Sequence, residues 1–120
     1  MRESFRRGKR DNRQKLLEKE LKRIINKLRS DSAIQKIILF GSLAKGEVSR
    51  SSDIDLIVVK HTNKRFFDRL DELNIKVQPN VGLDIFVYSP DEFVWMRENN
   101  VFVRHALRTG VILHEAKPSS

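Results

Sequence analysis

The sequence predicts a single domain of the α/β (α+β) class, built as a small mixed β-sheet with helices packed on one side. A chain of 120 residues can bury one hydrophobic core but leaves no room for a second domain. Short apolar runs of strand length alternate with segments in which apolar residues recur every three or four positions, as in amphipathic helices. Only one short helix separates the two apolar strands that carry acidic residues, and this arrangement favours a small mixed sheet.

The N-terminal segment carries the excess of positive charge. The net charge is +8, and residues 1–30 hold 12 of the 24 lysines and arginines but only 4 of the 16 acidic residues. Residues 1–11 are basic with almost no apolar content, which predicts a disordered arm, whereas residues 12–29 have the apolar stripe of an amphipathic helix. Such a segment can contact nucleic acid or an acidic protein surface, or it can be a solvated helix face.

Two apolar strands follow, with small residues between them. We expect the first strand at 34–40 and a short helical turn from Leu43 to Lys45 that Gly46 ends. A loop rich in serine and arginine covers 47–52, and the second strand runs over 54–60.

The second half of the chain alternates helices with strands. In chain order we expect a helix at 63–73, a short strand at 75–77, a strand at 81–88, a helix from 90, a helix at 101–108 and a strand at 111–114. Ser89, Pro90 and Glu92 have the spacing of a capping box with proline at the first helical position. Gly110 fits the C′ position that follows a helix, and residues 116–120 are expected to form a tail.

Asp53 and Asp55 stand at the entrance of the second strand. Because side chains alternate along a strand, both carboxylates leave the same face, with Cα atoms about 6.6 Å apart. This arrangement suits ligands that share a pair of Mg²⁺ ions about 3.5–4 Å apart. Taken alone, such a pair can also be a solvated strand entrance.

Two further features strengthen the metal interpretation. Gly41 and Ser42 form a turn of small residues after an apolar run, and such a turn lets backbone N–H groups and a hydroxyl approach phosphate oxygens. Asp84 lies inside another apolar strand, where a buried carboxylate without partners would be costly. A metal site shared with Asp53 and Asp55 would relieve that cost.

Residues 40–56 resemble the signature of the nucleotidyltransferase fold of the DNA polymerase beta superfamily. The resemblance rests on Phe40-Gly41-Ser42, Lys45-Gly46 and Ser52-Asp53-Ile54-Asp55-Leu56, followed by a carboxylate on a later strand. The pattern is similar to that of minimal nucleotidyltransferases (MNT), with residues 12–115 as the domain. Many MNT proteins are encoded beside a small helical HEPN protein, and the two form a toxin–antitoxin pair.

The resemblance implies roles for five residues. Gly41 and Ser42 would contact the β- and γ-phosphates of a nucleoside triphosphate. Asp53 and Asp55 would hold two Mg²⁺ ions. Asp84 would complete one metal site, either as a base for the acceptor hydroxyl or only as a ligand.

Two other side chains have open roles. Lys45 stands where the family more often has arginine, so it either contacts phosphate or lies on the surface. Tyr88 shares its strand face with Asp84, so it either packs in the core or stacks on a nucleobase.

The resemblance implies Mg²⁺-dependent transfer of a nucleoside monophosphate, with ATP as the expected donor of AMP, to a hydroxyl acceptor. A tyrosine of a HEPN-type toxin is the expected acceptor, which would make the chain an antitoxin. One alternative is a module that binds nucleotide or partner and neutralises a toxin by occlusion without catalysis. Others are an antibiotic-type nucleotidyltransferase acting on a small molecule, and an RNA-tail-modifying enzyme that contacts nucleic acid through residues 1–30.

Several classes of site and location are excluded. The chain has no cysteine, so it forms neither disulfides nor a thiolate zinc site. It has no P-loop motif. The N-terminus lacks the apolar segment of a secretory signal, and no apolar run approaches the ~20 residues of a membrane span. We therefore expect a soluble cytoplasmic protein without membrane contact.

Overall fold

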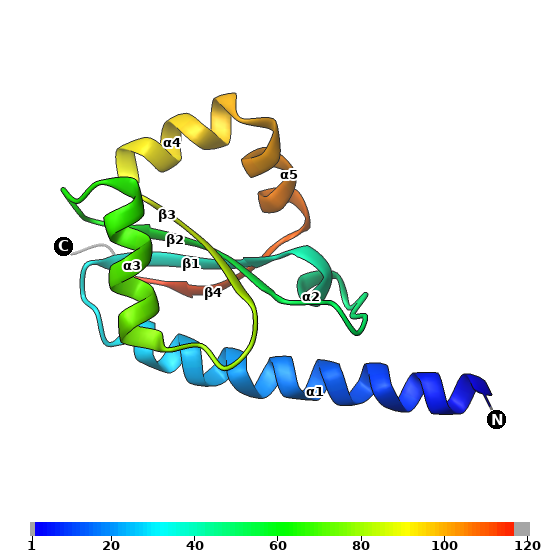
Figure 1. Cartoon of the computed structure of the whole chain (residues 1–120). Coiled ribbons are helices and arrows are strands. Elements are labelled where there is room, and N and C mark those ends of the chain that lie inside the picture. The colour runs from blue at the N-terminus through cyan, green and yellow to red at the C-terminus, as the bar shows by residue number, and fades with distance from the viewer. Residues whose placement is uncertain (1, 117–120) are drawn as a thin grey trace.

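The computed structural model describes the backbone of residues 2–116 and the side chains of residues 12–116 (Figure 1). Its elements in chain order are α1 (Arg2–Arg29), β1 (Ile34–Phe40), α2 (Gly41–Lys45), β2 (Ile54–Lys60), α3 (Phe66–Val77), β3 (Leu83–Tyr88), α4 (Pro90–Asn99), α5 (Val101–Thr109) and β4 (Val111–Glu115). The strands form a sheet in the order β3-β2-β1-β4. β1 pairs antiparallel with β2 and β4, while β2 pairs parallel with β3. The predicted α+β class with a small mixed sheet is confirmed.

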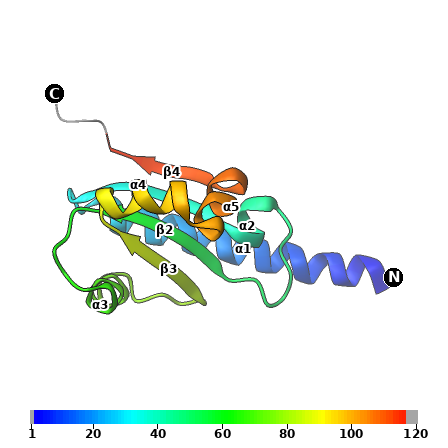
Figure 2. The ribbon, with the colours of Figure 1, turned by 90° about the horizontal axis from the view of Figure 1, so that it is seen from above.

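Helices cover both faces of the sheet, so the prediction that they pack on one side is wrong (Figures 1 and 2). The face under α1 and α3 buries Ile37 and Leu56, and the face under α4 and α5 buries their neighbours Ile38 and Ile57. The inner strands β1 and β2 carry unbroken apolar runs, which are typical of strands covered on both sides. Burial of each such side chain contributes about 1.5–3 kcal/mol to the stability of the fold. With a single layer of helices, the apolar side chains on the other face of the sheet would stay in water and would not contribute.

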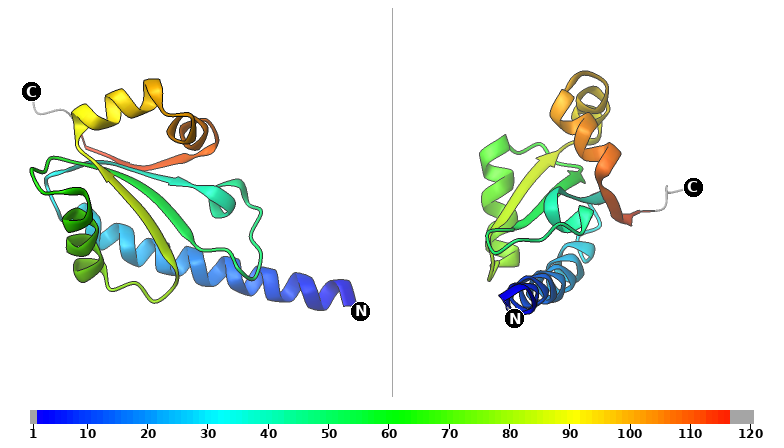
Figure 3. Two further views of the ribbon diagram at one scale, coloured as in Figure 1. Left: turned by 45° about the horizontal axis from the view of Figure 1, so that its top comes forward. Right: turned by 90° about the vertical axis from the view of Figure 1, so that its right-hand side faces the viewer.

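The crossover through α3 makes β2 and β3 parallel, since the chain returns along α3 and enters β3 from the end at which β2 began (Figure 3). Both strands therefore start at the end of the sheet where α2 follows β1 (Figure 1). This pairing aligns Asp55 with Asp84.

The helix α1 begins at Arg2, ten residues before the predicted start at residue 12. The side chains of residues 2–11 and all of residues 117–120 lie outside the described part, so the character of the basic arm and of the tail stays a prediction. No helix in the described part of the chain combines the length and the apolar character needed to cross a membrane.

The helix α3 replaces the predicted helix at 63–73 and the predicted strand at 75–77. Leu73 and Val77 are buried four residues apart, which continues the helical stripe, whereas Ile75 is 73% exposed. Of the two β-branched residues that suggested a strand, Val77 therefore occupies a buried helical position and Ile75 an exposed one. The helix ends at Gln78, which adopts the left-handed conformation with φ of 47°.

The ends of α4 and α5 give one confirmed and one corrected prediction. The capping box is present, because Ser89 Oγ accepts from the Glu92 N–H and the Glu92 carboxylate accepts from the Ser89 N–H. Gly110, however, has an extended φ of −87°. A Cβ there would lie 2.5 Å from the Ala106 carbonyl oxygen and 2.8 Å from the Leu39 carbonyl oxygen. Glycine is needed at this position for close approach of the backbone.

Candidate active site

The three aspartates predicted to act together lie at one end of the sheet. Asp53 precedes β2, Asp55 is the second residue of β2, and Asp84 is the second residue of β3. Asp55 and Asp84 are direct neighbours across the parallel pair. By alternation the side chains of Asp55 and Asp84 leave the face that α4 and α5 cover. Asp53 lies one residue before β2, and its carboxylate contacts Arg13 of α1, the helix on the opposite face. The apolar flanks of Asp84 suggested a buried carboxylate, but the residue is exposed because β3 is an edge strand.

Gly41 and Gly82 make room for these carboxylates. Gly41 has φ of 77°, and a Cβ built on it would lie 2.2 Å from Oδ2 of Asp55. A Cβ on Gly82 would lie 2.4 Å from Oδ1 of Asp53. Gly41 is therefore required both for its backbone conformation and for its contact with Asp55. Gly82 was not singled out in the sequence, because its partner is 29 positions away in the chain.

Negative charge accumulates around Asp55. Partial burial raises the pKa of this carboxyl to about 6, assisted by the charge of Asp84, a hydrogen bond with Asp84 and the charge of Asp53. Each cause disfavours the ionised form. A cation bound between these residues would reverse the effect, as divalent ions do at other carboxylate sites.

The donor chemistry of this trio fits Mg²⁺, which takes carboxylate oxygens and needs few protein ligands. Among residues 12–116, however, no three histidine, aspartate or glutamate side chains are grouped as a ready ligand set for a metal ion. Asp53 contacts Arg13, while Asp55 lies against Asp84. Asp55 and Asp84 would thus begin a metal site, and Asp53 would leave Arg13 to join it.

The turn predicted to bind phosphate follows β1 directly. Gly41 starts α2, and the helix ends after one turn at Gly46, which has φ of 72°. Ser42 Oγ donates to Ser52 Oγ at 2.9 Å, and Ser52 Oγ also accepts from the Ser49 N–H at 2.8 Å. Ser52 is buried, so this serine cluster ties the turn to the loop before Asp53. Lys45 is exposed in the last residue of α2.

Arg13 on α1 holds the same loop from the other side. Its Nε and Nη2 donate to the Ser52 carbonyl oxygen at 3.1 and 2.8 Å, and Nη2 lies 3.4 Å from Oδ1 of Asp53. The sequence carried no signal for this role, since Arg13 is one of many basic residues in its segment.

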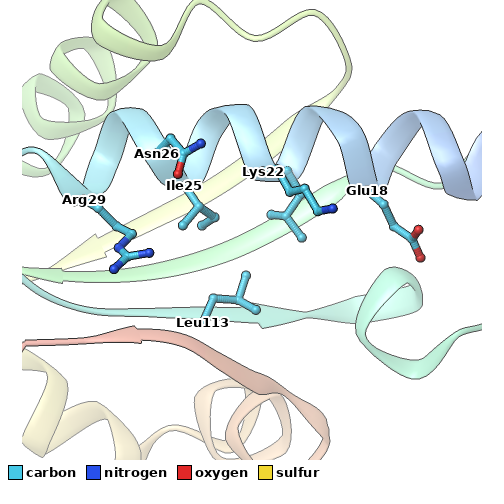
Figure 4. A pocket seen from close by; sticks show the side chains of 7 residues that line it. Glu18, Lys22, Ile25, Asn26, Arg29 and Leu113 are labelled. Atoms are coloured by element: carbon cyan, nitrogen blue, oxygen red, sulfur yellow. The ribbon is translucent and has the colours of Figure 1, made fainter.

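A separate hollow of about 470 Å³ lies between α1 and β4 (Figure 4). Leu21, Ile25 and Leu113 supply its apolar lining, while Glu18, Lys22 and Arg29 stand at its edge. These apolar residues pack with the core on the α1 side of the sheet, away from the face of Asp55 and Asp84. The hollow is therefore not part of the acidic site.

The chain is similar in sequence to a known protein family and to a curated relative. The family model described as polymerase beta, nucleotidyltransferase matches residues 22–119. A relative from Methanocaldococcus jannaschii, provisionally named protein adenylyltransferase MJ0604, is 34% identical over 100 residues. The match spans 81% of this chain and 97% of that protein.

Solved structures show a similar fold. A Sulfolobus solfataricus protein, provisionally described as a nucleotidyltransferase, superposes with a TM-score of 0.64 over 92% of this chain and 91% of its own, at 20% identity. At that identity the likeness concerns the fold alone. A mutant form of the MntA–HpeT toxin–antitoxin complex, with a tyrosine changed to alanine, matches with a TM-score of 0.51 and 25% identity. That match covers 78% of this chain and 71% of the other.

Proposed function

The chain belongs to the polymerase beta nucleotidyltransferase family, and from this membership we propose that it transfers AMP from ATP to a hydroxyl group of a partner protein. The M. jannaschii relative, which is named for adenylylation of protein and is matched over nearly its whole length, supports ATP as donor and protein as acceptor. The likeness to a chain of the MntA–HpeT toxin–antitoxin complex supports the resemblance to minimal nucleotidyltransferases.

One observation carries the proposal at the level of the site. Asp55 and Asp84 are neighbours on parallel strands, and partial burial of Asp55, together with the charge of Asp84, raises the pKa of Asp55 to about 6. A protein gains no stability from carboxylates arranged in this way. The arrangement is useful when a divalent cation and a triphosphate are bound, since the cation then neutralises both sets of charges.

The proposed reaction follows from these positions. The acceptor oxygen bonds to the α-phosphorus of ATP, the bond from that phosphorus to the β-phosphate oxygen breaks, and pyrophosphate leaves. Two Mg²⁺ ions held by the three aspartates would neutralise phosphate charge and lower the pKa of the acceptor hydroxyl. The Gly41 N–H and the Ser42 hydroxyl would bind the β- and γ-phosphates. Asp84 either accepts the hydroxyl proton or only holds an ion while water accepts it.

For the acceptor we propose a tyrosine of a helical HEPN-type toxin, which this chain would inactivate. The support is the similarity to one chain of a toxin–antitoxin complex in which a tyrosine was changed to alanine. A phenol also fits the chemistry, because its oxygen ionises more readily than that of serine or threonine.

The test is to co-express the chain with the protein encoded by the neighbouring gene, add ATP and Mg²⁺, and measure intact masses. We expect the partner to gain the mass of one AMP. Asp53→Asn should abolish the gain, because it removes one metal ligand. Asp71→Asn, a change of an exposed aspartate on α3, is the matched control and should leave the gain intact.

Other outcomes would change the assignment. A complex that forms without any mass gain, for wild type and Asp53→Asn alike, would replace catalysis by occlusion. A gain that survives Asp53→Asn would show that the acidic site is not the catalytic one.

A further inference from the structure

Phe40, Phe86 and Phe102 come together from three elements on the face that carries the aspartates. Phe40 ends β1, Phe86 lies in β3, and Phe102 is in the first turn of α5. The ring centroid of Phe102 lies 5.5 Å from those of both Phe40 and Phe86, in edge-to-face geometry, and the latter two are 6.2 Å apart. We call these three residues the phenylalanine cluster.

The phenylalanine cluster borders the acidic site directly. Phe40 pairs with Asp55 across β1 and β2, and it immediately precedes the turn predicted to bind phosphate. Phe86 follows Asp84 by two residues and so leaves the same face of β3. The helix α5 packs against both α2 and β1, which brings Phe102 to the same end of the sheet (Figures 1 and 2).

Phe102 is far more exposed than the other two residues of the phenylalanine cluster, although packing of the core does not require an exposed ring there. Phe40 is 8% exposed, Phe86 is partly buried, and Phe102 is 48% exposed. The helix α5 is already fastened by Val103 and Ala106, which are 0% and 1% exposed. Phe102 thus rests on two fixed rings while half of its own surface stays open beside the carboxylates.

We propose that the exposed side of Phe102 is the stacking surface for the nucleobase of the bound nucleoside triphosphate; this inference depends on the proposed function. With phosphates at Gly41 and Ser42 and the α-phosphorus at the aspartates, the nucleoside extends to one side of the carboxylates. On the side of the carboxylates that α5 covers, the nucleoside would meet the aromatic surface of the phenylalanine cluster. Tyr88, the alternative considered from the sequence, is only 8% exposed and is not available for stacking.

The physical gain from such a surface is substantial. Stacking of a base on an aromatic side chain is worth about 1–3 kcal/mol by alanine substitution, which is roughly a fivefold or larger change in affinity. Phe102 is held in place by Phe40 and Phe86, so little side-chain freedom is lost when a base binds.

The test compares a ligand with a base to one without. Binding of ATP and of inorganic tripolyphosphate, each with Mg²⁺, is measured by calorimetry for the wild type and for Phe102→Leu, which keeps an apolar side chain that packs on the cluster. We expect Phe102→Leu to weaken ATP binding at least about fivefold and to leave tripolyphosphate binding unchanged. Phe102→Tyr retains the ring and should restore ATP affinity. Val101→Ala, a change of the 81% exposed neighbour, is the control and should change neither affinity.

The other results separate the stacking role from the proposed function. Equal loss for both ligands would make Phe102 a structural residue. Unchanged ATP affinity with slower AMP transfer would place the acceptor, not the base, against the ring. ATP binding that depends on Phe102 without any transfer to a partner would refute the proposed function while the stacking role stands. Absence of ATP binding by the wild type would refute both.

Discussion

The carboxyl group of Asp55 has a pKa of about 6 in the folded protein, above the value near 3.8 expected in an unfolded chain. The folded state therefore binds this proton more tightly, and the resulting contribution to stability is complete below pH 3.8 and is lost as the pH rises through 6. We predict that Asp55→Asn stabilises the metal-free protein by about 1 kcal/mol at pH 8, after allowance for screening of a partly exposed group, and by much less at pH 4. Urea unfolding at both pH values measures this.

The control for the Asp55→Asn prediction is to repeat the stability measurement with Mg²⁺. The ion should raise the melting temperature of the wild type more than that of Asp55→Asn, since it relieves repulsion that only the wild type has. A variant that is less stable than the wild type at pH 8 without Mg²⁺ would contradict the charge argument.

Gly82 offers a second prediction at the level of one residue. Gly82→Ala would place a Cβ 2.4 Å from Oδ1 of Asp53, but this carboxylate is the end of a side chain and can move. We expect folding to survive and AMP transfer to fall at least about tenfold, because displacement of a positioned group by about 1 Å can cost that much or more. The test is to measure the rate of AMP transfer and the melting temperature on the same preparations of the wild type and of Gly82→Ala. Normal transfer would mean that contact with Gly82 does not set the position that Asp53 takes during transfer.

Among the elements, α1 holds the chain segments that enter both acidic strands. Arg13 binds the loop before β2, as described above. About two turns further on, Glu20 accepts hydrogen bonds from Arg23 at 2.6 and 3.0 Å and from Asn80. Arg23 in turn donates to the Val77 and Gln78 carbonyl oxygens at 2.9 and 3.1 Å. The helix therefore fixes the turn that leads into β3 as well.

Glu20 makes this attachment testable. It is 6% exposed, and the hydrogen bond from Arg23 is the main reason why its pKa is lowered from 4.5 to about 2. The contribution to stability is present above pH 4.5 and is lost as the pH falls through 2. We predict that Glu20→Gln costs about 1.5–3 kcal/mol at pH 7, the range for hydrogen bonds to charged groups, and that the difference shrinks below pH 4.5.

The control for this prediction is Glu18→Gln, a change of an exposed glutamate on the same helix. Its urea unfolding curve at pH 7 should match that of the wild type. A cost for Glu20→Gln that stays constant from pH 7 to pH 2 would show that packing, not charge, gives the effect.

Across the whole molecule, the sequence predicted what local patterns specify. The bounds of β1 and β2 and the capping box at Ser89 follow from residues close together in the chain. The missed features depend on contacts between distant residues. Arg13 reaches Ser52 from 39 positions away. The apolar runs of β1 and β2 are visible in the sequence, but which helices cover each face depends on contacts between distant segments.

The arrangement of the sheet predicts how amide hydrogen exchange should vary over the molecule. The inner strands β1 and β2 are buried on both faces, whereas β4 is an edge strand in which Val111 and Ile112 are 44% and 53% exposed. Because exchange from such regions requires opening of the structure, we expect β1 and β2 to exchange most slowly and β4 faster than either. ATP with Mg²⁺ should then slow exchange in residues 41–53, while β4 should keep its rate. Protection of β4 instead would mean that the nucleotide binds at a hollow that β4 lines, either the one between α1 and β4 or a second one near α4 that Glu115 lines.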